Sequence, residues 1–458
     1  MMTLSEAAFA LGVAHRGENP LFTAVGTDSR NIQAGQLFIA LRGQRFDAHA
    51  YLACARDAGA VAAMVDEQGA ALAPLGLPLI VVNNTHRGLT QLAYAWRSQF
   101  TGPLVALTGS SGKTTVKEML AAILREVYGE HVLATRGNLN NDIGVPLTLL
   151  ALRAHHRCAV IEMGMNHAGE IRALTLLARP DVALVNNAGR AHIEFLGSLE
   201  AIARAKGEIF EGLTAQGVAV INADDGYALL WKKIINKIKY LQFGLDQPSE
   251  VTARHELRAL NSTLHLSTPV GAITATLNAP GLHNVRNALA ASAAAIALNV
   301  PLSAIAAGLV KYTGVKGRLQ RKSLPGGVTL IDDTYNANPE SIGAAIDVLA
   351  RAGEPRMLVL GDMGELGAHA AACHTEVGAH AREAGIETLY ALGEMSAHAV
   401  AAFGANARHF ADADALINQL RTVLSPGVAG TAVLVKGSRF MKMERVVDAL
   451  AREAQACC

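Results

Sequence analysis

Hydrophobic positions occur along the chain in two patterns, short continuous runs and residues at helical spacing, and each pattern predicts a different element. Short apolar runs at 104–107, 158–161 and 182–185 have the length of strands that are buried in a parallel sheet. After the first run, apolar residues recur at helical spacing from Val116 to Val127, and a further helix is expected over 199–213. Strands and helices that alternate in this way need crossover connections, so the pattern predicts an α/β fold with a mainly parallel sheet.

The same patterns divide the chain into three regions. Residues 1–82 mix short apolar runs with Gly-rich turns, and we expect a small N-terminal α/β domain there. Residues 83–312 form a central domain and include a polar–apolar alternation over 251–277, which predicts a short antiparallel meander. In residues 313–458 a helical stretch follows each of four apolar runs, which predicts a Rossmann-like C-terminal α/β domain. These four runs are 328–331, 357–360, 389–392 and 432–435.

One uncharged stretch, 288–310, is long enough to span a bilayer. It is rich in alanine, and Pro301 interrupts it, so we expect two short buried helices instead of a membrane span. The first residues lack a basic region and include Glu6, which is not the pattern of a secretory signal. We therefore expect a protein with no stable membrane insertion.

The composition excludes several classes of protein. A chain of 458 residues is too long for one hydrophobic core, and 51% hydrophobic with 17% charged residues is typical of a globular protein. The formal net charge of +1 excludes a general nucleic-acid or membrane-surface binder, so any phosphate binding has to be local. The five cysteines show neither metal-ligand spacing nor a disulfide framework, which is typical of a reducing cytoplasm.

The turn after the apolar run 104–107 predicts a phosphate site. Its glycines let backbone N–H groups point inward, and the free amides at the start of the following helix attract an anion. Lys113 can reach the terminal phosphates, and the Thr114 hydroxyl can ligate a phosphate-bound Mg²⁺. Leu107 stands where the G-x-x-x-x-G-K loop has its first glycine, which favours an ATP-using class other than the GTPase-like switches. The loop consists of Thr108, Gly109, Ser110, Ser111, Gly112, Lys113, Thr114 and Thr115.

Polar side chains follow several predicted strands, at the edge of the sheet where ligands of α/β proteins bind. Glu162 comes directly after its strand, where it could ligate a metal beside the phosphates or cap a helix. For His192 a metal or substrate role and a structural role are about equally expected. In the third region, Asp333, Asp362 and Glu365 could face a ribose or an amine substrate, or cap the helices that follow.

Three further polar stretches suit a substrate, although each would also pass as an ordinary turn. Two lie in the first region and combine small polar, acidic and basic residues, as expected around a phosphorylated ligand. The third, 137–146, is dense in amides that can orient a substrate or a metal-bound water. The residues singled out are Asp28, Ser29 and Arg30, then Arg45, Asp47 and His49, and then Asn138 and Asn141.

In their order along the chain, these motifs resemble the Mur ligases, the cytosolic amide-forming enzymes of bacterial peptidoglycan synthesis. The resemblance covers essentially the whole chain. The strings K-T-T-V-K-E-M, I-D-D-T-Y-N-A-N-P and L-G-D-M-G-E-L are similar to those of the member that uses D-alanyl-D-alanine. The D-N-P-R string of the sibling that adds a diamino acid is absent. The motifs that carry the resemblance are the loop 108–115, the loop 137–146, Glu162, His192, Lys206, the stretch 281–287, Arg318 and Asp333.

The resemblance implies an architecture and a reaction. The architecture is an N-terminal UDP-binding domain, a central P-loop ATPase domain and a Rossmann-like C-terminal domain, with the catalytic cleft between the second and the third. The reaction uses ATP and two Mg²⁺ ions to phosphorylate the carboxylate of UDP-N-acetylmuramoyl-tripeptide. The amine of D-alanyl-D-alanine then displaces phosphate from the acyl phosphate.

The resemblance also implies roles for single residues. Catalysis is expected of Lys113, Glu162, His192, a carbamylated Lys206 and Arg318. The expected metal ligands are Thr114, Glu162, His192 and Lys206. Nucleotide contacts outside the loop are expected of Asn284, Asn287, Arg318 and Asp333. Substrate contacts are expected of Asp28, Ser29, Arg30, Arg45, Asp47, His49, Asn336, and Asn138 or Asn141.

Two alternatives stay open at this point. The first is a related ligase that adds a single amino acid, either the tripeptide-forming sibling or a folylpolyglutamate synthase. The stretch 28–30 counts against the folate enzyme, which lacks a UDP-binding module. The second is an ATP- or GTP-binding regulatory module, against which Leu107 and the second α/β domain count. We further expect a cytoplasmic monomer with small-molecule substrates and no nucleic-acid partner.

Overall fold

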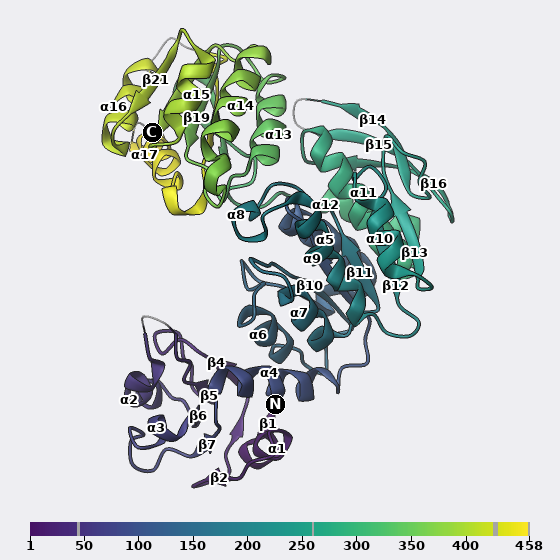
Figure 1. Cartoon of the computed structure of the whole chain (residues 1–458), viewed down its shortest axis with the longest axis vertical. Helices are drawn as coiled ribbons and strands as arrows, with labels where there is room; N and C mark the ends of the chain where they lie inside the picture. Colours follow the sequence, from purple (N-terminus) through teal and green to yellow (C-terminus); the bar gives the residue numbers. More distant parts are fainter. Residues whose placement is uncertain (44–45, 259–260, 425–428, 457–458) are drawn as a thin grey trace.

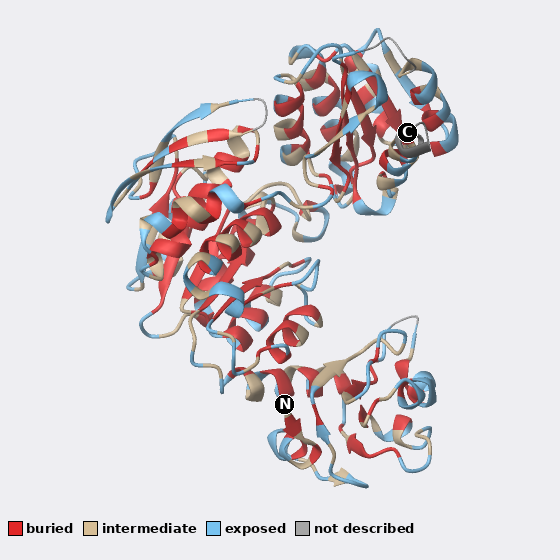
Figure 2. Cartoon of the chain, turned by 180° about the vertical axis from the view of Figure 1, so that it is seen from behind, coloured by how far each residue is buried: buried red, intermediate tan, exposed pale blue. Residues whose placement is uncertain are grey.

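The computed structural model describes residues 1–458 apart from 44–45, 259–260, 425–428 and 457–458. Three α/β bodies follow one another along its long axis, in the order in which they occur in the sequence (Figure 1). Buried residues concentrate on the strands of each body and on the helix faces that cover them (Figure 2). The structure therefore confirms the expected α/β architecture of three successive domains.

The N-terminal body is built on a five-stranded sheet in the order β2-β7-β6-β5-β4. All its pairs are parallel except that of β2 with β7. A two-stranded pair, β1 (Met2–Thr3) with β3 (Leu21–Phe22), lies beside it. The five strands are β2 (His15–Arg16), β4 (Ala24–Gly26), β5 (Gln36–Ile39), β6 (Ala62–Val65) and β7 (Leu79–Val81). The helices are α1 (Leu4–Ala10), α2 (Leu52–Asp57) and α3 (Glu67–Ala70), with a 3₁₀ turn, η1 (Ala48–Tyr51).

The central body contains a six-stranded, fully parallel sheet in the order β13-β12-β11-β8-β10-β9. Its middle strand β8 sits where the strand order reverses, which is the position at which such sheets bind ligands. The strands are β8 (Leu104–Thr108), β9 (Val132–Ala134), β10 (Cys158–Glu162), β11 (Val182–Val185), β12 (Val218–Asn222) and β13 (Lys239–Phe243). The predicted strands of this region are thereby confirmed.

Helices cover both faces of the central sheet, because alternate residues of β8 face opposite ways. Leu104 and Ala106 pack on one side, and Val105 and Leu107 on the other. The first side is covered by α4 (Thr85–Arg97), α6 (Gly144–Leu150), α7 (Glu170–Ala178) and α9 (Leu199–Gly207). The second is covered by α5 (Lys113–Tyr128), α11 (Leu282–Ala297) and α12 (Leu302–Lys311). Two short helices, α8 (Ile193–Leu196) and α10 (Ala228–Ile235), contact α9 on the first side.

In the central region one predicted helix is shorter than expected, and the predicted meander is present. The helix predicted over 199–213 is shorter, because α9 ends at Gly207 and a 3₁₀ turn, η3 (Glu208–Gly212), follows. At that point the Glu208 carboxylate accepts the N–H groups of Gly169 and Arg172 at the start of α7, so the chain bends towards that helix. The meander is confirmed as the antiparallel strands β14 (Thr252–Leu257), β15 (Ser262–Thr268) and β16 (Gly271–Leu277).

The uncharged stretch 288–310 forms parts of two buried helices, α11 and α12, as expected, although α11 is longer than predicted. Small residues allow the close packing: a Cβ on Gly308 would lie 2.3 Å from the Cα of Ile123 on α5. Within the described residues, none of the helices combines the length and the apolar character that crossing a bilayer requires.

The C-terminal body contains a second six-stranded sheet, in the order β17-β18-β22-β19-β20-β21. Only β17 is antiparallel. The strands are β17 (Gln320–Leu324), β18 (Val328–Asp333), β19 (Arg356–Gly361), β20 (Thr388–Leu392), β21 (Ala407–Phe410) and β22 (Ala432–Lys436). The helices are α13 (Pro339–Leu349), α14 (Ala370–Glu383), α15 (Ser396–Phe403), α16 (Ala413–Val423) and α17 (Glu444–Ala456). The four predicted strand–helix units are confirmed, and the polar edge strands β17 and β21 were missed.

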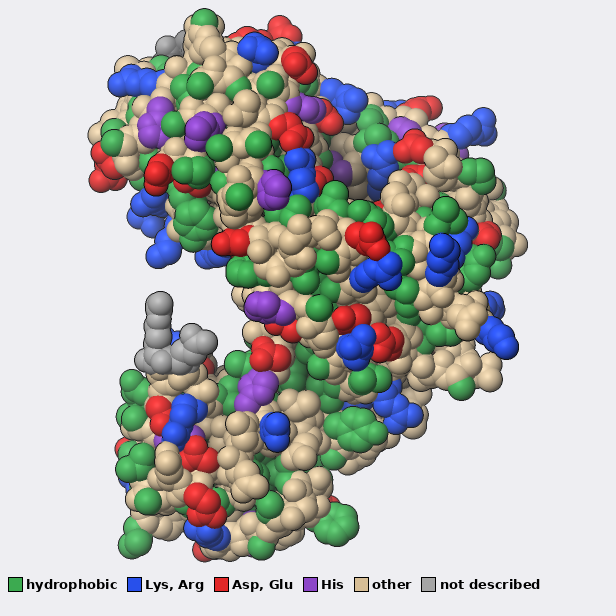
Figure 3. Space-filling model, viewed as in Figure 1, with side chains coloured by type: hydrophobic (Ala, Val, Ile, Leu, Met, Phe, Trp, Pro, Cys, Tyr) green, Lys and Arg blue, Asp and Glu red, His purple; other side chains and the backbone are tan. Residues whose placement is uncertain are grey.

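The bodies are arranged around a hollow. The molecular surface is indented between the N-terminal and the C-terminal body, and the central body forms the back of the indentation (Figure 3). The C-terminal body approaches the central one near α8, on the side where the central strands end (Figure 1). Side chains of the first and third bodies can therefore meet a ligand held at the edge of the central sheet.

Candidate active site

The loop between β8 and α5 forms a closed cradle at the carboxyl edge of the central sheet. Gly112 has a left-handed backbone (φ 78°), and a Cβ there would lie 2.4 Å from Oδ1 of Asn287. Glycine is required at this position on both counts. The Lys113 ammonium folds back over the loop and donates to the Gly109 carbonyl at 2.7 Å. The loop thus has the glycine turn that a phosphate site requires, and phosphate binding by Lys113 stays a prediction.

The electrostatics of Lys113 fit an anion-binding role. Burial lowers the pKa of Lys113, while the nearby Glu162 carboxylate raises it and Arg318 lowers it further. An anion bound at the loop would supply a favourable partner for a desolvated ammonium. Phosphate binding is therefore more favourable at this buried lysine than it would be at an exposed one.

Two asparagines after β11 fix the loop in place, and the sequence reasoning assigned them no role. The Asn186 amide donates to the Ser111 carbonyl at 3.0 Å and to Oδ1 of Asn287 at 3.1 Å. Oδ1 of Asn187 accepts the Ser111 N–H at 2.9 Å. Asn284 and Asn287 are both buried on α11, and Asn287 lies against Gly112 of the loop. The available signal was two adjacent amides directly after a buried strand.

Glu162 ends β10 and is 2% exposed. Its Oε1 accepts the Asn140 amide at 2.8 Å, and its own N–H donates to the Thr135 hydroxyl at 2.9 Å. Its Oε2 is buried and has no hydrogen-bond partner among the described residues. A buried carboxylate oxygen without a donor is costly unless something else pairs with it. The chemistry of this oxygen fits a cation ligand better than a helix cap.

In the asparagine-rich loop, Asn140 makes a contact with Glu162 that was not predicted. Asn140 reaches Glu162, whereas Asn138 is exposed and Asn141 accepts the Gly144 N–H at 2.9 Å at the start of α6. Asn138 and Asn141 were expected as alternative substrate contacts, and that expectation stays a prediction. The amide content of the loop was informative, but the turn of its backbone decides which amide points inward.

Lys206 and His192 flank the same edge. Lys206 is 1% exposed on α9, and within the described residues its ammonium has no hydrogen bond or ion pair. Burial holds the pKa of Lys206 well below its ordinary value, the Lys113 charge lowers it further, and Asp225 opposes the shift. His192 has a left-handed backbone (φ 64°), and its Nδ1 lies 2.6 Å from Oε2 of Glu365 in the C-terminal domain.

The C-terminal domain also reaches the phosphate loop. Nη2 of Arg318 donates to the Thr114 hydroxyl at 2.9 Å, and its guanidinium stacks 4.4 Å from the centre of the Tyr335 ring. The Asn338 amide donates to the Ser111 hydroxyl at 3.0 Å. Arg318 and Asn338 thus contact the loop from the C-terminal domain. The nucleotide contact expected of Arg318 stays a prediction, and no role was predicted for Asn338.

Asp333 is placed differently. Its Oδ2 accepts the Lys436 ammonium at 2.6 Å, and its Oδ1 accepts the Leu319 N–H at 3.1 Å. Burial raises the pKa of Asp333, and the Lys436 charge counteracts this shift. Asn336, three residues further, is exposed and accepts the Ala337 N–H. In this arrangement Asp333 holds the strand β22 and the segment that follows Arg318.

Comparison with known proteins agrees with these features across the whole chain. Residues 107–295 match the family model "Mur ligase middle domain", 317–439 match "Mur ligase, glutamate ligase domain", and 21–97 match "Mur ligase family, catalytic domain". The chain belongs to the Mur ligase family. The resemblance seen in the motifs is thereby confirmed.

Individual Mur ligases match the chain from end to end. The UDP-N-acetylmuramoyl-tripeptide--D-alanyl-D-alanine ligase of Escherichia coli (strain K12) is 43% identical over 451 residues, which cover 98% of each chain. A crystal structure of MurF from Acinetobacter baumannii superposes with a TM-score of 0.90 at 36% identity, covering 98% of this chain and 99% of that one. MurF from Thermotoga maritima in complex with ADP gives 0.82 at 27% identity, covering 96% and 99%.

The N-terminal residues singled out in this Mur ligase lie apart from the phosphate loop (Figure 1). Asp28 and Arg30 pair with each other at 2.7 Å, and this pairing lowers the pKa of Asp28 to about 2. Ser29 lies between them, in the turn that follows β4. Arg45 lies outside the described residues. Within the described residues, the side-chain hydrogen bonds of Asp28 and Arg30 are all with residues of their own turn.

His49 does not suit the predicted substrate contact. It is 1% exposed, its Nδ1 lies 2.5 Å from Oδ1 of Asp47, and its Nε2 accepts the Asp66 N–H at 3.2 Å. A Cβ on Gly69 would overlap its ring, so the imidazole is enclosed by the domain. His49 thus orders the loop that carries Asp47, and both ring nitrogens are engaged in doing so.

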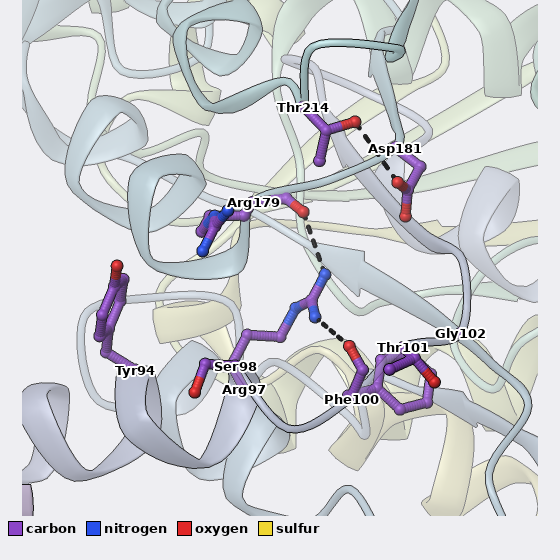
Figure 4. Close-up of a pocket in the computed structure, with 9 residues that line it drawn as sticks. All are labelled: Tyr94, Arg97, Ser98, Phe100, Thr101, Gly102, Arg179, Asp181 and Thr214. Atoms are coloured by element: carbon purple, nitrogen blue, oxygen red, sulfur yellow. Dashed lines mark hydrogen bonds between the residues drawn. The ribbon is translucent and has the colours of Figure 1, made fainter.

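A cavity of about 220 Å³ lies at the opposite edge of the Mur ligase central sheet (Figure 4). Its lining includes Arg97, Arg179, Asp181 and Thr214. The Arg97 guanidinium donates to the carbonyls of Ala178, Phe100 and Arg179. Oδ2 of Asp181 accepts the Leu104 N–H. Because these groups bind the backbone at the amino ends of the strands, the cavity is part of the scaffold.

Proposed function

We propose that this Mur ligase joins D-alanyl-D-alanine to UDP-N-acetylmuramoyl-tripeptide at the expense of ATP. The observation that carries the proposal is the unpartnered Glu162 oxygen beside the phosphate loop, in a chain that matches ligases of that name from end to end. The loop supplies phosphate binding, and the relatives supply the identity of the substrates. The tripeptide-forming and folate alternatives gain no support from these relatives.

Lys113 and the loop amides are proposed to hold the ATP phosphates. The tripeptide carboxylate attacks the γ-phosphorus, the bond to the β–γ bridging oxygen breaks, and ADP leaves. The D-alanyl-D-alanine amine then attacks the acyl-phosphate carbon and expels phosphate, and the amine loses a proton. Lys113 and Arg318 are positioned to stabilise the negative charge that accumulates between the two anions.

Glu162 and the Thr114 hydroxyl are proposed to hold one Mg²⁺. Mg²⁺ takes one or two carboxylates together with phosphate oxygens and water, and the free Oε2 of Glu162 suits that donor set. Bound Mg²⁺ would neutralise charge between the reacting anions. In the present structure Arg318 donates to the Thr114 hydroxyl, so Arg318 would exchange this contact for a phosphate when the site is filled.

Lys206 and His192 are proposed to serve a second Mg²⁺, with Lys206 as a carbamate. A neutral lysine amine adds to the carbon of CO₂ and loses one proton, which leaves a carboxylate on the side chain. Burial without a partner favours the neutral amine that this addition requires. The carbamate would present an anion where an ammonium would repel the ion and Lys113.

The remaining assignments rest on the family. Asn284 and Asn287 are proposed on the adenine side, and Asp28, Ser29 and Arg30 at the UDP end of the substrate. Asp333 is proposed near the ribose, although its carboxylate is engaged with Lys436. The cytoplasmic location and the monomeric state stay predictions.

The test is phosphate release from ATP with purified UDP-N-acetylmuramoyl-tripeptide, measured with and without D-alanyl-D-alanine. We expect release that requires both substrates, together with formation of the pentapeptide product. Parallel reactions with a UDP-dipeptide and a diamino acid, and with a folate and glutamate, should give background rates. Faster turnover in either parallel reaction would overturn the substrate assignment.

A further inference from the structure

One arginine of the central domain reaches across to the C-terminal domain. Arg190 lies in the segment between β11 and α8. Its Nε donates to Oε1 of Glu340 on α13 at 2.8 Å. Its Nη1 and Nη2 donate to the two carboxylate oxygens of Glu376 on α14, at 2.6 and 2.9 Å. One guanidinium therefore binds two helices of the neighbouring domain.

The segment that carries Arg190 is also part of the phosphate site. The Gly189 N–H donates to the Ser110 hydroxyl at 2.8 Å, and that hydroxyl donates to the Gly189 carbonyl at 3.0 Å. Asn187, two residues earlier, holds the N–H of Ser111. Arg190 thus ties the C-terminal domain to a segment that is hydrogen-bonded to the phosphate loop.

Other contacts show what this connection holds in place. With Arg190 paired, Arg318 lies on Thr114 and Asn338 lies on Ser111. Asn338 is the residue at the start of α13, the helix that carries Glu340. Arg318 stacks on Tyr335, which lies four residues before α13, so both C-terminal groups that touch the phosphate loop contact the start of this helix or the segment just before it.

We propose that Arg190 is a positioning residue for ATP: its pairing with Glu340 and Glu376 holds the C-terminal domain where Arg318 and Asn338 meet the phosphate loop. The proposal rests on the proposed function, since ATP is the ligand of that loop. Arg190 acts through the position of Arg318 and Asn338, and it touches no reacting atom.

The geometry distinguishes this connection from an ordinary surface pair. The Arg190 side chain is 27% exposed, and its contact with Glu376 is bidentate, which restricts the orientation of α14 as well as its distance. Arg190 also holds the pKa of Glu376 below its ordinary value. Exposed single pairs contribute little, whereas a guanidinium shared by two helices couples both to one point.

The proposal predicts where the kinetic effect appears. If Arg190 favours the arrangement that binds ATP, removing it lowers the population of that arrangement before ATP binds. The apparent KM for ATP should then rise about three- to tenfold, while kcat at saturating ATP stays nearly unchanged. Raising the salt concentration should bring the wild-type KM towards that of the variant, because the pairs are partly exposed.

The experiment compares Arg190→Ala, Glu376→Ala and the double variant in the full chain. Arg172→Ala is the matched control, because Arg172 forms a bidentate pair with Glu211 inside the central domain. Each protein is assayed for KM and kcat, and small-angle X-ray scattering without ATP reports the separation of the domains. We expect a higher KM and a larger radius of gyration in Arg190→Ala, no change in Arg172→Ala, and a double variant no worse than Arg190→Ala.

The outcomes separate this proposal from the proposed function. A KM and a scattering curve of Arg190→Ala that match those of Arg172→Ala would overturn the positioning role. Additive effects of Arg190→Ala and Glu376→Ala would also overturn it, since the two residues would then act independently. If the wild type releases no phosphate with its substrates, the proposed function fails instead, and scattering still tests the pairing.

Discussion

The central and the C-terminal domain contain sheets of the same kind, yet their polar edges differ in one respect. At the central edge, Oε2 of Glu162 is buried without a partner among the described residues. The Lys206 side chain is also buried, and it forms no hydrogen bond or ion pair among these residues. At the C-terminal edge, Asp333 is paired with Lys436, and Asp362 accepts the N–H groups of Met395 and Ser396. Similar residues at equivalent edges are thus left available in one domain and satisfied in the other.

This difference identifies the catalytic edge better than the fold does. A parallel sheet brings the carboxyl ends of its strands together in both domains, so position alone does not assign chemistry. A buried polar group without a partner costs free energy, which a bound cation, phosphate or substrate recovers. The same reasoning assigns Asp362, whose carboxylate accepts two N–H groups of its own domain, to the scaffold.

The largest expected effect comes from removing the cation of the central loop. Lys113→Ala should abolish ligation, because the loss of one preorganised charge in the transition state typically raises the barrier by ~3 kcal/mol or more. Folding should be retained, since Lys113 binds only the Gly109 carbonyl within the loop. The rate of phosphate release checks this, with the exposed Lys233→Ala as the control. Near-wild-type turnover in folded Lys113→Ala would remove this loop from catalysis.

The next effect concerns the unpartnered Lys206. Arginine keeps a positive charge but does not form a carbamate, so Lys206→Arg should lose activity by roughly 10–100-fold. Lys206→Ala should recover part of its activity when small carboxylic acids are added, and the wild type should slow when CO₂ is depleted. Full activity in Lys206→Arg would contradict the carbamate.

The contacts at the two sheet edges show which features could be predicted from the sequence and which could not. The loop 108–115 and the strand ends were predictable, because local glycine, lysine and apolar patterns determine them. The pairing of Asp333 with Lys436 was not, since it joins two strands through residues 103 positions apart. The contact of Asn140 with Glu162 was not predictable either, because it depends on the turn of one loop.

The edge strands show the same limit. The sequences of β17 (Gln320–Leu324) and β21 (Ala407–Phe410) are short and largely polar, so they lack the apolar run from which a strand is predicted. Their strand conformation comes from pairing with neighbours in the sheet. The partners of Arg190 were unpredictable for a related reason: Glu340 and Glu376 lie on helices of another domain.

A smaller effect, on stability, is expected where α11 of the central domain lies next to α13 of the C-terminal domain. His283 on α11 faces Val348 across Gly281, and burial lowers the pKa of His283 to about 4. Between pH 4 and the ordinary value near 6.5, the unfolded chain binds a proton that the folded chain does not. Stability should therefore fall by up to about 2–3 kcal/mol as the pH drops from 6.5 to 4.

Urea unfolding of the wild type and of His283→Gln across this pH range measures that contribution. The variant removes the titrating group, so the difference between the two free energies of unfolding should shift in favour of the variant as the pH falls. A difference that stays constant from pH 6.5 to 4 would mean that His283 titrates normally at the junction.

The central claim is tested most directly by matched amide substitutions at the two edges, Glu162→Gln and Asp362→Asn, assayed for phosphate release that depends on D-alanyl-D-alanine. Glu162→Gln keeps an acceptor for the Asn140 amide but removes the charge, so activity should fall roughly 10–100-fold and more Mg²⁺ should be needed. Asp362→Asn should cost about 1–2 kcal/mol of stability and leave the rate per folded molecule unchanged. Equal rates in the two variants, or a loss confined to Asp362→Asn, would contradict the assignment of catalysis to the central edge.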